Sequence, residues 1–329
     1  MKHKHLISFS NWSADEINEI LELSTQLKQK RKNGEIIEPL KQKSLFMLFY
    51  EQSTRTRNSL EAAMTQLGGH AHDLTVEKMQ ISHGETAKDT AKVLSRMGEA
   101  IAVRNCFFNQ GNKYLNQLKE HSDIPVISMQ DDIYHPLQAI ADMMTINEVF
   151  YSQVTHLKVS ICWTYATTHL KPLSVPHSQL LMFPKFGIDL SIAHPPEFPL
   201  MPEVIETAGA IAQDNQTQLN FVDNLEAALD QADIIIPKNW GGFLGIENFK
   251  GREEQIRAIK SKQNDYQNWI LDEKLYKLAK PNAKIMHALP ADRNHEVTDR
   301  LLDSENSVIY QEAENRLHTA KAILTYLMT

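Results

Sequence analysis

The sequence predicts an α/β protein built from two doubly wound parallel-sheet domains that are linked by long helices. Its 329 residues suit two domains of typical size. Apolar runs with the character of strands alternate with segments of helical spacing, an order that produces a parallel sheet covered by helices. Because this alternation occurs once before residue 150 and again after it, we expect a first domain at 1–150, completed by a C-terminal helix at 311–329, and a second at 151–310.

The first domain is expected to open with a helix over 12–30. Apolar residues recur there at helical spacing behind Ser10 and Ser13, either of which can cap the helix. Three strands and two intervening helices follow, with the strands at 45–50, 100–103 and 126–129 and the helices at 59–67 and 86–97. A long helix over 136–151 then links the two domains.

The second domain contains a longer series of short apolar runs. Strands are expected at 158–163, 189–193, 218–222, 233–237, 284–287 and 307–310. A final helix over 319–328 returns the chain to the first domain. The pattern therefore predicts a second parallel sheet.

Composition excludes several classes of function. The chain has 42% hydrophobic and 23% charged residues, as ordinary globular proteins do. A formal net charge of -7 without a concentrated basic block argues against a nucleic-acid partner. No apolar run approaches the length that spans a membrane, and the N-terminus lacks the apolar core of a signal peptide, so we expect a cytoplasmic protein without a membrane partner. Cys106 and Cys162 fit a reducing compartment, and since the histidines lack metal-ligand spacing, we expect no metal and no cofactor.

The most informative segment of the chain is Phe49–Glu61, which reads FYEQSTRTRNSLE. It places a hydroxyl- and arginine-rich turn between a buried strand and the start of a helix. Such a turn offers an anion the free N–H groups of a helix N-terminus, the hydroxyls of Ser53, Thr54 and Thr56, and the guanidinium of Arg55. The turn lacks glycine, so it is neither a P-loop nor a dinucleotide fingerprint. We expect a ligand with a phosphate group; the simpler explanation is that Ser53 caps the helix and the arginines are solvated.

This segment resembles the carbamoyl-phosphate motif of the aspartate and ornithine carbamoyltransferase family. Other motifs of that family follow in order along nearly the whole chain: a mobile-loop segment at Gln80–Thr86, Val103-Arg104, His135-Pro136-Leu137-Gln138, His287-Ala288-Leu289-Pro290 and Glu312–Leu317. The resemblance implies that an amine attacks the carbonyl carbon of carbamoyl phosphate and that phosphate leaves. It further implies that the first domain binds carbamoyl phosphate and the second binds the amine or amino acid.

The resemblance also assigns roles to individual residues. It places carbamoyl phosphate on Ser53, Thr54, Arg55, Thr56, Gln80, Arg104, His135, Gln138, the backbone carbonyl of Leu289, and Arg316. Arg55, Arg104 and His135 become the catalytic residues, because they polarise the carbonyl oxygen as it gains charge. A simpler explanation for His135 is a capping or packing role before proline. Arg57 and Arg293 are expected to be positioning residues or salt-bridge partners.

A second resemblance concerns the loop Trp163–Pro176. It is similar to the proline-rich loop of the knotted carbamoyltransferases that act on N-acetylornithine and N-succinylornithine, and Lys238-Asn239-Trp240 is similar to another of their segments. This implies a trefoil knot in the second domain. The candidates for binding the second substrate are Trp163, Lys238, Trp240 and His287, although Trp240 can equally be a core aromatic residue.

The amine itself stays open. Ala288 occupies the position where most ornithine-type relatives have cysteine, and their Asp-x-x-x-Ser-Met-Gly segment is absent. We expect a carbamoyltransferase of amino-acid metabolism, such as arginine biosynthesis, that acts on an ornithine-like amine, free or N-acylated. The alternatives are diaminopropionate or putrescine as acceptor, or a catalytically silent paralogue that binds carbamoyl phosphate. The resemblance further implies a homotrimer in which Gln80 reaches a neighbouring site.

Overall fold

The computed structural model describes residues 4–167, 171–241 and 252–329. The chain forms two compact units. Unit 1 consists of the residues up to Met144 together with Ala313–Thr329, and unit 2 of Thr145–Glu312.

Unit 1 contains a four-stranded parallel sheet in the order β2-β1-β3-β4. Its strands are β1 (Ser44–Phe49), β2 (His70–Thr75), β3 (Ala100–Asn105) and β4 (Val126–Asp131). The inner strands are buried on both faces, which explains why they read as continuous apolar runs. The polar edge strand β2 was missed for the opposite reason, because its residues are only half buried or exposed.

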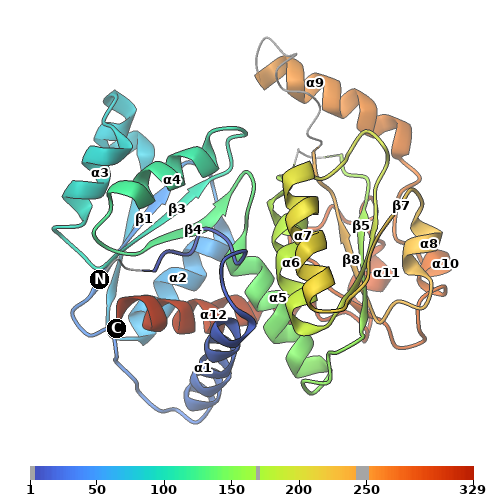
Figure 1. Ribbon diagram of the computed structural model, residues 1–329, viewed down its shortest axis with the longest axis horizontal. Helices are drawn as coiled ribbons and strands as arrows, with labels where there is room; N and C mark the ends of the chain where they lie inside the picture. Colours follow the sequence, from blue (N-terminus) through green and yellow to red (C-terminus); the bar gives the residue numbers. More distant parts are fainter. Residues whose placement is uncertain (1–3, 168–170, 242–251) are drawn as a thin grey trace. The chain divides into compact units, whose positions relative to one another are not determined.

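Seven helical segments complete the part of unit 1 that the structure describes, together with α12 (Ile309–Met328), which begins in unit 2. They are α1 (Ala14–Lys32), α2 (Thr54–Gln66), η1 (Val76–Lys78), η2 (Gln80–His83), α3 (Ala87–Leu94), α4 (Gly111–His121) and α5 (Pro136–Val149), which ends in unit 2. Helices α3 and α4 lie on one side of the sheet, and α2 and α12 lie on the other (Figure 1). Ser13 caps α1 in a reciprocal arrangement with Glu16, as one of the two caps expected.

Unit 2 contains a five-stranded parallel sheet in the order β7-β6-β5-β8-β9. Its strands are β5 (Lys158–Trp163), β6 (Asp189–Ala193), β7 (Leu219–Val222), β8 (Ile234–Lys238) and β9 (Lys284–Ile285). The described helices are α6 (Ser174–Met182), η3 (Phe183–Phe186), α7 (Pro202–Asp214), α8 (Leu225–Leu229), α9 (Arg252–Gln263), η5 (Asn264–Tyr266), α10 (Glu273–Tyr276) and α11 (Asp299–Leu302). Helices α6 and α7 cover one face of this sheet (Figure 1).

Three expectations about local structure need correction. The strand expected at 307–310 is wrong: Ser307 forms only an isolated bridge with Ile285, and α12 begins at Ile309. A short apolar run cannot be told from a helix start by periodicity alone. Helix α2 begins at Thr54 rather than at residue 59, so the hydroxyl-rich turn is its first turn. Helix α4 was not expected at all.

The proline-rich loop expected at 163–176 is only partly described. Residues 168–170 of this loop, and Gly242 after the Lys238–Trp240 segment, lie outside the described residues. Pro176 is not in a loop, because α6 begins at Ser174 and includes this proline in its first turn, where a missing N–H costs nothing. Among the helices that the structure describes, none is long and apolar enough to span a bilayer.

Candidate active site

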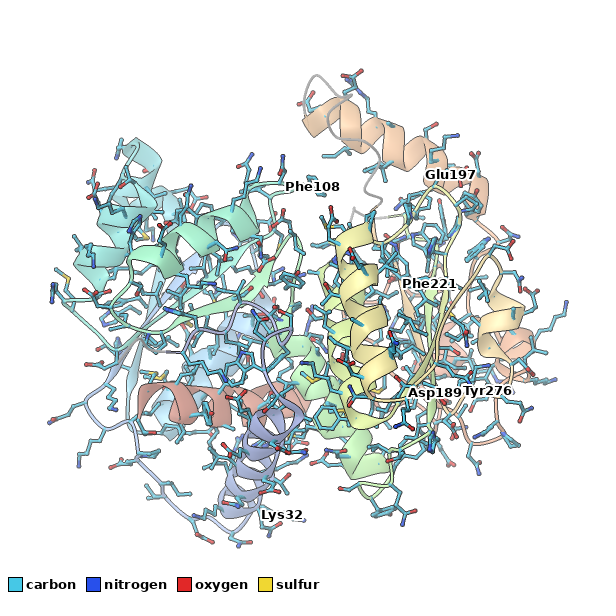
Figure 2. All side chains as sticks on the ribbon, in the orientation of Figure 1. Lys32, Phe108, Asp189, Glu197, Phe221 and Tyr276 are labelled. Carbon is cyan, nitrogen blue, oxygen red and sulfur yellow. The ribbon has the colours of Figure 1, made fainter. Side chains whose placement is uncertain are left out.

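The sequence motifs of unit 1 gather at one edge of its sheet. The carboxyl ends of parallel strands share an edge, and ligands of open α/β sheets bind there. The turn that begins at Ser53 follows β1, Arg104 lies near the end of β3, and His135 follows β4. Figure 2 labels Phe108, which lies in the loop after β3 at this edge. The fold therefore brings together motifs that are separated in the sequence.

Ser53 does not act as an ordinary helix cap. It occupies the N-cap position of α2 with extended backbone angles, φ -156° and ψ 117°, but its side chain makes no capping hydrogen bond. Ser13, by contrast, accepts a hydrogen bond from the backbone N–H of Glu16 at 3.1 Å. The side chain of Thr54 is exposed and that of Arg55 is half buried. The first turn of α2 thus presents backbone N–H groups, hydroxyls and a guanidinium, which suit an anion.

Three of the expected site residues form one buried hydrogen-bond network. The guanidinium of Arg316 donates from Nη1 to Gln138 Oε1 at 2.6 Å and from Nη2 to Thr56 Oγ1 at 3.2 Å. Gln138 in turn donates from Nε2 to Asp142 Oδ1 at 2.7 Å. Thr56 and Gln138 are 2% exposed, and Arg316 is 4% exposed. Three residues that the motifs assign to carbamoyl phosphate therefore lie together, and the network holds a positive charge beside the first turn of α2.

Arg104 and His135 are each held by neighbouring polar groups. Arg104 donates from Nη1 to the side-chain oxygen of Gln130 on β4, a residue that the motifs did not identify. His135 is 4% exposed, and its carbonyl accepts hydrogen bonds from the N–H groups of Gln138 at 3.0 Å and Ala139 at 3.3 Å. The main chain of His135 therefore starts α5, as the simpler explanation proposed.

Two adjacent carboxylates brace the loops that follow β3 and β4. Asp131 accepts hydrogen bonds from the N–H groups of Ile133 and Tyr134, both at 2.8 Å, and from the Ser128 hydroxyl at 2.7 Å. Asp132 accepts from the N–H groups of two residues near the start of α4, Asn109 and Asn112, both at 2.7 Å. Burial raises the pKa of Asp131 to about 7, against the lowering effect of the Ser128 hydrogen bond. These bonds fix the turn that leads into His135.

The remaining expected residues of unit 1 lie nearer the surface. Arg57 forms an ion pair with Asp73, and its guanidinium lies 4.0 Å from the ring centre of Phe49, so its expected role as a salt-bridge partner is confirmed. Gln80 is exposed in η2. Its carbonyl accepts a hydrogen bond from the N–H of Glu85 at 3.1 Å, which closes the loop on itself.

In unit 2, the His287 imidazole is buried. Burial lowers its pKa, against the raising effect of Glu296. Its Nδ1 accepts a hydrogen bond from the N–H of Leu289 at 2.8 Å, so the ring proton belongs on Nε2, which lies 3.4 Å from Glu296 Oε2. Its own backbone N–H donates to Glu312 Oε2 at 2.8 Å. The motif at 287–290 is thus a tight turn held by side chains.

The other candidates for the second substrate are also buried. Lys238 is 6% exposed, and its Nζ donates to the carbonyl of Asn239 at 2.9 Å. Trp163 and Trp240 are fully buried, and their indole N–H groups donate to the carbonyls of Trp240 at 2.8 Å and Phe198 at 2.9 Å. These contacts agree with a core role for both tryptophans.

Arg293, the other arginine expected to be structural, forms ion pairs with Asp299 at 2.6 Å and Asp303 at 2.9 Å. This expectation is confirmed. Within the described residues, no group of three or more His, Cys, Asp or Glu side chains is arranged to hold a metal ion.

Several polar residues of these sites were not identified from the sequence. They are Gln130 and Asp142 in unit 1, and Lys171, Asn239 and Glu296 in unit 2. Only Asp142 carried a local signal, because it lies four residues after Gln138 on the same helix and therefore on the same face. The others act through contacts between distant segments, which a single sequence does not reveal.

Comparison with known proteins agrees with this geometry. Residues 4–148 match the model of the carbamoyl-P binding domain of aspartate/ornithine carbamoyltransferase, and residues 171–327 match its Asp/Orn binding domain. The chain is 39% identical over 330 residues to a catabolic ornithine carbamoyltransferase of Thermoplasma acidophilum, with 100% of both chains covered.

Two solved structures resemble it over nearly their whole length. Ornithine carbamoyltransferase from Pyrococcus furiosus has a TM-score of 0.87 at 33% identity, with 99% of this chain and 97% of that chain covered. Acetylornithine transcarbamylase complexed with acetylcitrulline has a TM-score of 0.89 at 28% identity, with 99% of both chains covered. From its motifs, its fold and these matches, the chain belongs to the aspartate/ornithine carbamoyltransferase family.

Proposed function

We propose that this protein moves the carbamoyl group of carbamoyl phosphate to the amine of an ornithine-like amino acid, free or N-acylated, and releases phosphate. Family membership supports the reaction and the ornithine-type acceptor. The observation that carries the proposal is the buried network of Arg316, Gln138 and Thr56. A catalytically silent paralogue has no chemical need to keep this arrangement together with Arg55, Arg104 and His135.

The phosphate of the substrate binds at the first turn of α2. Ser53, Thr54 and the backbone N–H groups of the turn donate to its oxygens, and Arg55 and Arg316 balance its charge. In a trimer, Gln80 of a neighbouring subunit completes this set. The uncapped state of Ser53 supports its place here, since its hydroxyl is not engaged in closing the helix.

The carbonyl oxygen of the substrate lies near Arg55, Thr56, Arg104 and His135. The amine nitrogen attacks the carbonyl carbon, an oxyanion forms, and the bond between that carbon and the phosphate oxygen breaks. Donors aimed at such an oxyanion commonly contribute about 2.7–4 kcal/mol each. The departing phosphate accepts the proton of the amine, so no protein base is required. Gln138 and the carbonyl of Leu289 accept hydrogen bonds from the carbamoyl NH2.

The amine binds in unit 2, where Lys238 and His287 are the candidate contacts, and Trp163 and Trp240 support the Lys238 segment from the core. Ala288 replaces the cysteine of most ornithine-type relatives and leaves the choice between free and N-acylated ornithine to experiment. The resemblance to the acetylornithine enzyme supports the N-acylated form.

We also propose that unit 2 carries the trefoil knot of the acetylornithine branch. The N–H of Gly241 donates to the carbonyl of Lys171 at 2.8 Å, and this contact between the two segments concerned supports the proposal. An experimental electron-density map that traces the chain through 163–176 and 238–252 decides it, and an unthreaded path would contradict it. The cytoplasmic homotrimer stays a prediction.

The reaction is tested with carbamoyl phosphate and a panel of acceptors: ornithine, N-acetylornithine, N-succinylornithine, diaminopropionate and putrescine. We expect a ureido product with one of the ornithine forms, formed in step with phosphate release. Transfer to diaminopropionate or putrescine alone would replace the proposed acceptor. Tight binding of carbamoyl phosphate without transfer to any of them would favour the silent paralogue.

A further inference from the structure

Unit 2 contains a fully buried carboxylate that none of the motifs explains. Glu296 has no exposed surface, and it lies in the loop that follows β9. Its Oε1 accepts a hydrogen bond from the N–H of Asn239 at 2.6 Å, and its Oε2 accepts one from the N–H of Asp292, also at 2.6 Å. Lys171, which is 6% exposed, forms an ion pair with the same Oε2.

These contacts join three segments that are far apart in the sequence. Lys171 precedes α6 and also donates from Nζ to the carbonyl of Pro290 at 3.1 Å. Asn239 directly follows β8, and its side chain donates from Nδ2 to the carbonyl of Thr164 at 2.7 Å, which adds the end of β5. Asp292 belongs to the same loop as Glu296. The carboxylate therefore joins Lys171 and the end of β8 to the loop 287–296, and the Asn239 side chain joins the end of β8 to the end of β5.

Two of these segments carry residues proposed to contact a substrate. Lys238 is the neighbour of Asn239, and His287 Nε2 lies 3.4 Å from Glu296 Oε2. The carbonyl of Leu289 lies one peptide before that of Pro290, which accepts the hydrogen bond from Lys171. A shift of Glu296 would therefore be felt by the amine-side candidates, although Glu296 itself has no surface for a ligand to touch.

The environment of Glu296 keeps the side chain ionised. Burial alone raises the pKa of this carboxyl, but His287, Lys238 and Lys171 hold it well below its usual value. A buried carboxylate is tolerated only while its hydrogen-bond donors and its countercharge stay in place. This requirement couples the positions of the three segments to one another.

We propose that Glu296, together with Lys171, is a positioning residue for the second substrate: the pair sets the spacing between the segment at 238–240 and the turn at 287–290. The inference rests on the proposed binding of the amine in unit 2. Catalysis is sensitive to such spacing, because a displacement of about 1 Å can lower the rate by on the order of a hundredfold.

A positioning role of the Glu296–Lys171 pair differs from a general stabilising role in its effect on the two substrates. The affinity for carbamoyl phosphate and the KM for the amine are therefore measured separately. In Glu296→Gln, one oxygen becomes an NH2 group that faces N–H donors and an ammonium, so the segments must move apart. The ligands of the phosphate lie in unit 1 or on a neighbouring Gln80, and only the Leu289 carbonyl contacts carbamoyl phosphate from unit 2. Because that contact is one hydrogen bond to a neutral NH2 group, the affinity for carbamoyl phosphate should change by no more than about threefold. The KM for the best amine of the panel should rise by about tenfold or more.

A double variant supplies a rescue. Lys171→Met alone leaves the carboxylate without its countercharge and should also raise the amine KM. Glu296→Gln combined with Lys171→Met removes both charges, so its amine KM should be lower than the product of the two single effects predicts. Asp299→Asn is the matched control. Asp299 is an acidic residue three positions after Glu296 that also forms an ion pair, with Arg293, but its side chain is 50% exposed. Its amine KM should equal that of the wild type.

The experiment consists of steady-state kinetics with both substrates varied and calorimetric titration with carbamoyl phosphate, both on the full-length protein. A rise in amine KM with unchanged carbamoyl-phosphate affinity supports the proposal. Equal losses for both substrates, or no change in amine KM in a folded variant, would overturn it. Glu296→Asp keeps the charge but shortens the side chain by one methylene. It is used if Glu296→Gln does not fold, and the same changes in amine KM and in carbamoyl-phosphate affinity support or overturn the proposal. Failure of the wild type to transfer to any amine would instead sink the proposed function, and this inference with it.

Discussion

Replacement of Arg316 by methionine should damage both the stability of unit 1 and the binding of carbamoyl phosphate. The side chain is 4% exposed and donates two hydrogen bonds, to Gln138 Oε1 and Thr56 Oγ1. Methionine fills a similar volume but cannot donate. The change therefore removes the two bonds and leaves two acceptors in a buried environment without their partner.

The magnitude follows from these contacts. A hydrogen bond from a charged donor contributes about 1.5–3 kcal/mol, so the loss of both bonds would cost about 3–6 kcal/mol. Removal of the guanidinium also removes its own desolvation penalty, so we expect the free energy of unfolding to fall by about 3 kcal/mol. The loss of one positive charge beside the phosphate should weaken carbamoyl-phosphate binding by on the order of a hundredfold.

Urea unfolding and calorimetric titration measure the two effects. Lys28→Met serves as the control. Lys28 lies on α1 and donates at 2.8 Å to Oδ1 of Asn315, the residue next to Arg316 on α12, but Lys28 is not part of the proposed site. It should cost less than about 1 kcal/mol, as partly exposed pairs do, and should leave the affinity unchanged. An Arg316→Met protein that binds carbamoyl phosphate as tightly as the wild type would refute the assignment of the phosphate to this network.

Three further predictions follow from other parts of unit 1. Arg55→Ala should lower turnover by on the order of a hundredfold in a folded protein, and near-normal turnover would show that the site is misplaced. Ser53→Ala should weaken carbamoyl-phosphate binding without lowering the free energy of unfolding, because the hydroxyl makes no capping bond; a stability loss of about 1 kcal/mol would identify it as a cap after all. Mixing chains that carry Arg55→Ala and Gln80→Ala should restore activity above either parent if Gln80 is donated by a neighbour, and a fully active monomer would contradict the trimer.

The pH dependence of stability gives a separate prediction for Asp131. Its pKa is raised from 3.8 to about 7 in the folded protein, so its ionisation opposes folding. The unfavourable contribution is absent below pH 3.8, grows as the pH rises, and is complete above about pH 7. Asp131→Asn cannot ionise. The free energy of unfolding of the variant minus that of the wild type should therefore increase by up to about 4 kcal/mol from pH 4 to pH 8. A constant difference across this range, measured by urea unfolding, would contradict the raised pKa.

The sequence predicted the elements whose cause is local. The buried strands β1, β3 and β5 stand out as apolar runs, and α1 begins where Ser13 and Glu16 form a capping box. Strand β2 was missed because it is a polar edge strand, stabilised by pairing with β1 rather than by its own pattern. The strand expected at 307–310 is wrong because the apolar run there is the start of α12. This helix contacts residues far away in the sequence, such as Thr56, which the local pattern does not reveal.

The same distinction applies to the site. The motifs identified Arg316 and Gln138, and the fold brings them to Thr56. Gln130 and Glu296 were missed because an isolated polar residue gives no sign of burial in the sequence. Their partners, Arg104 and Lys171, lie 26 and 125 residues away along the chain. Such residues become visible only when the contacts between segments are known.

An experimental structure of the protein with carbamoyl phosphate is the decisive test of the proposed substrate site. We expect the phosphate at the first turn of α2, with its oxygens within hydrogen-bond distance of Ser53 Oγ and the Arg55 guanidinium, and with the carbonyl oxygen facing Arg104 and His135. A phosphate bound away from the first turn of α2, or one that leaves the Arg55 guanidinium in solvent, would contradict it.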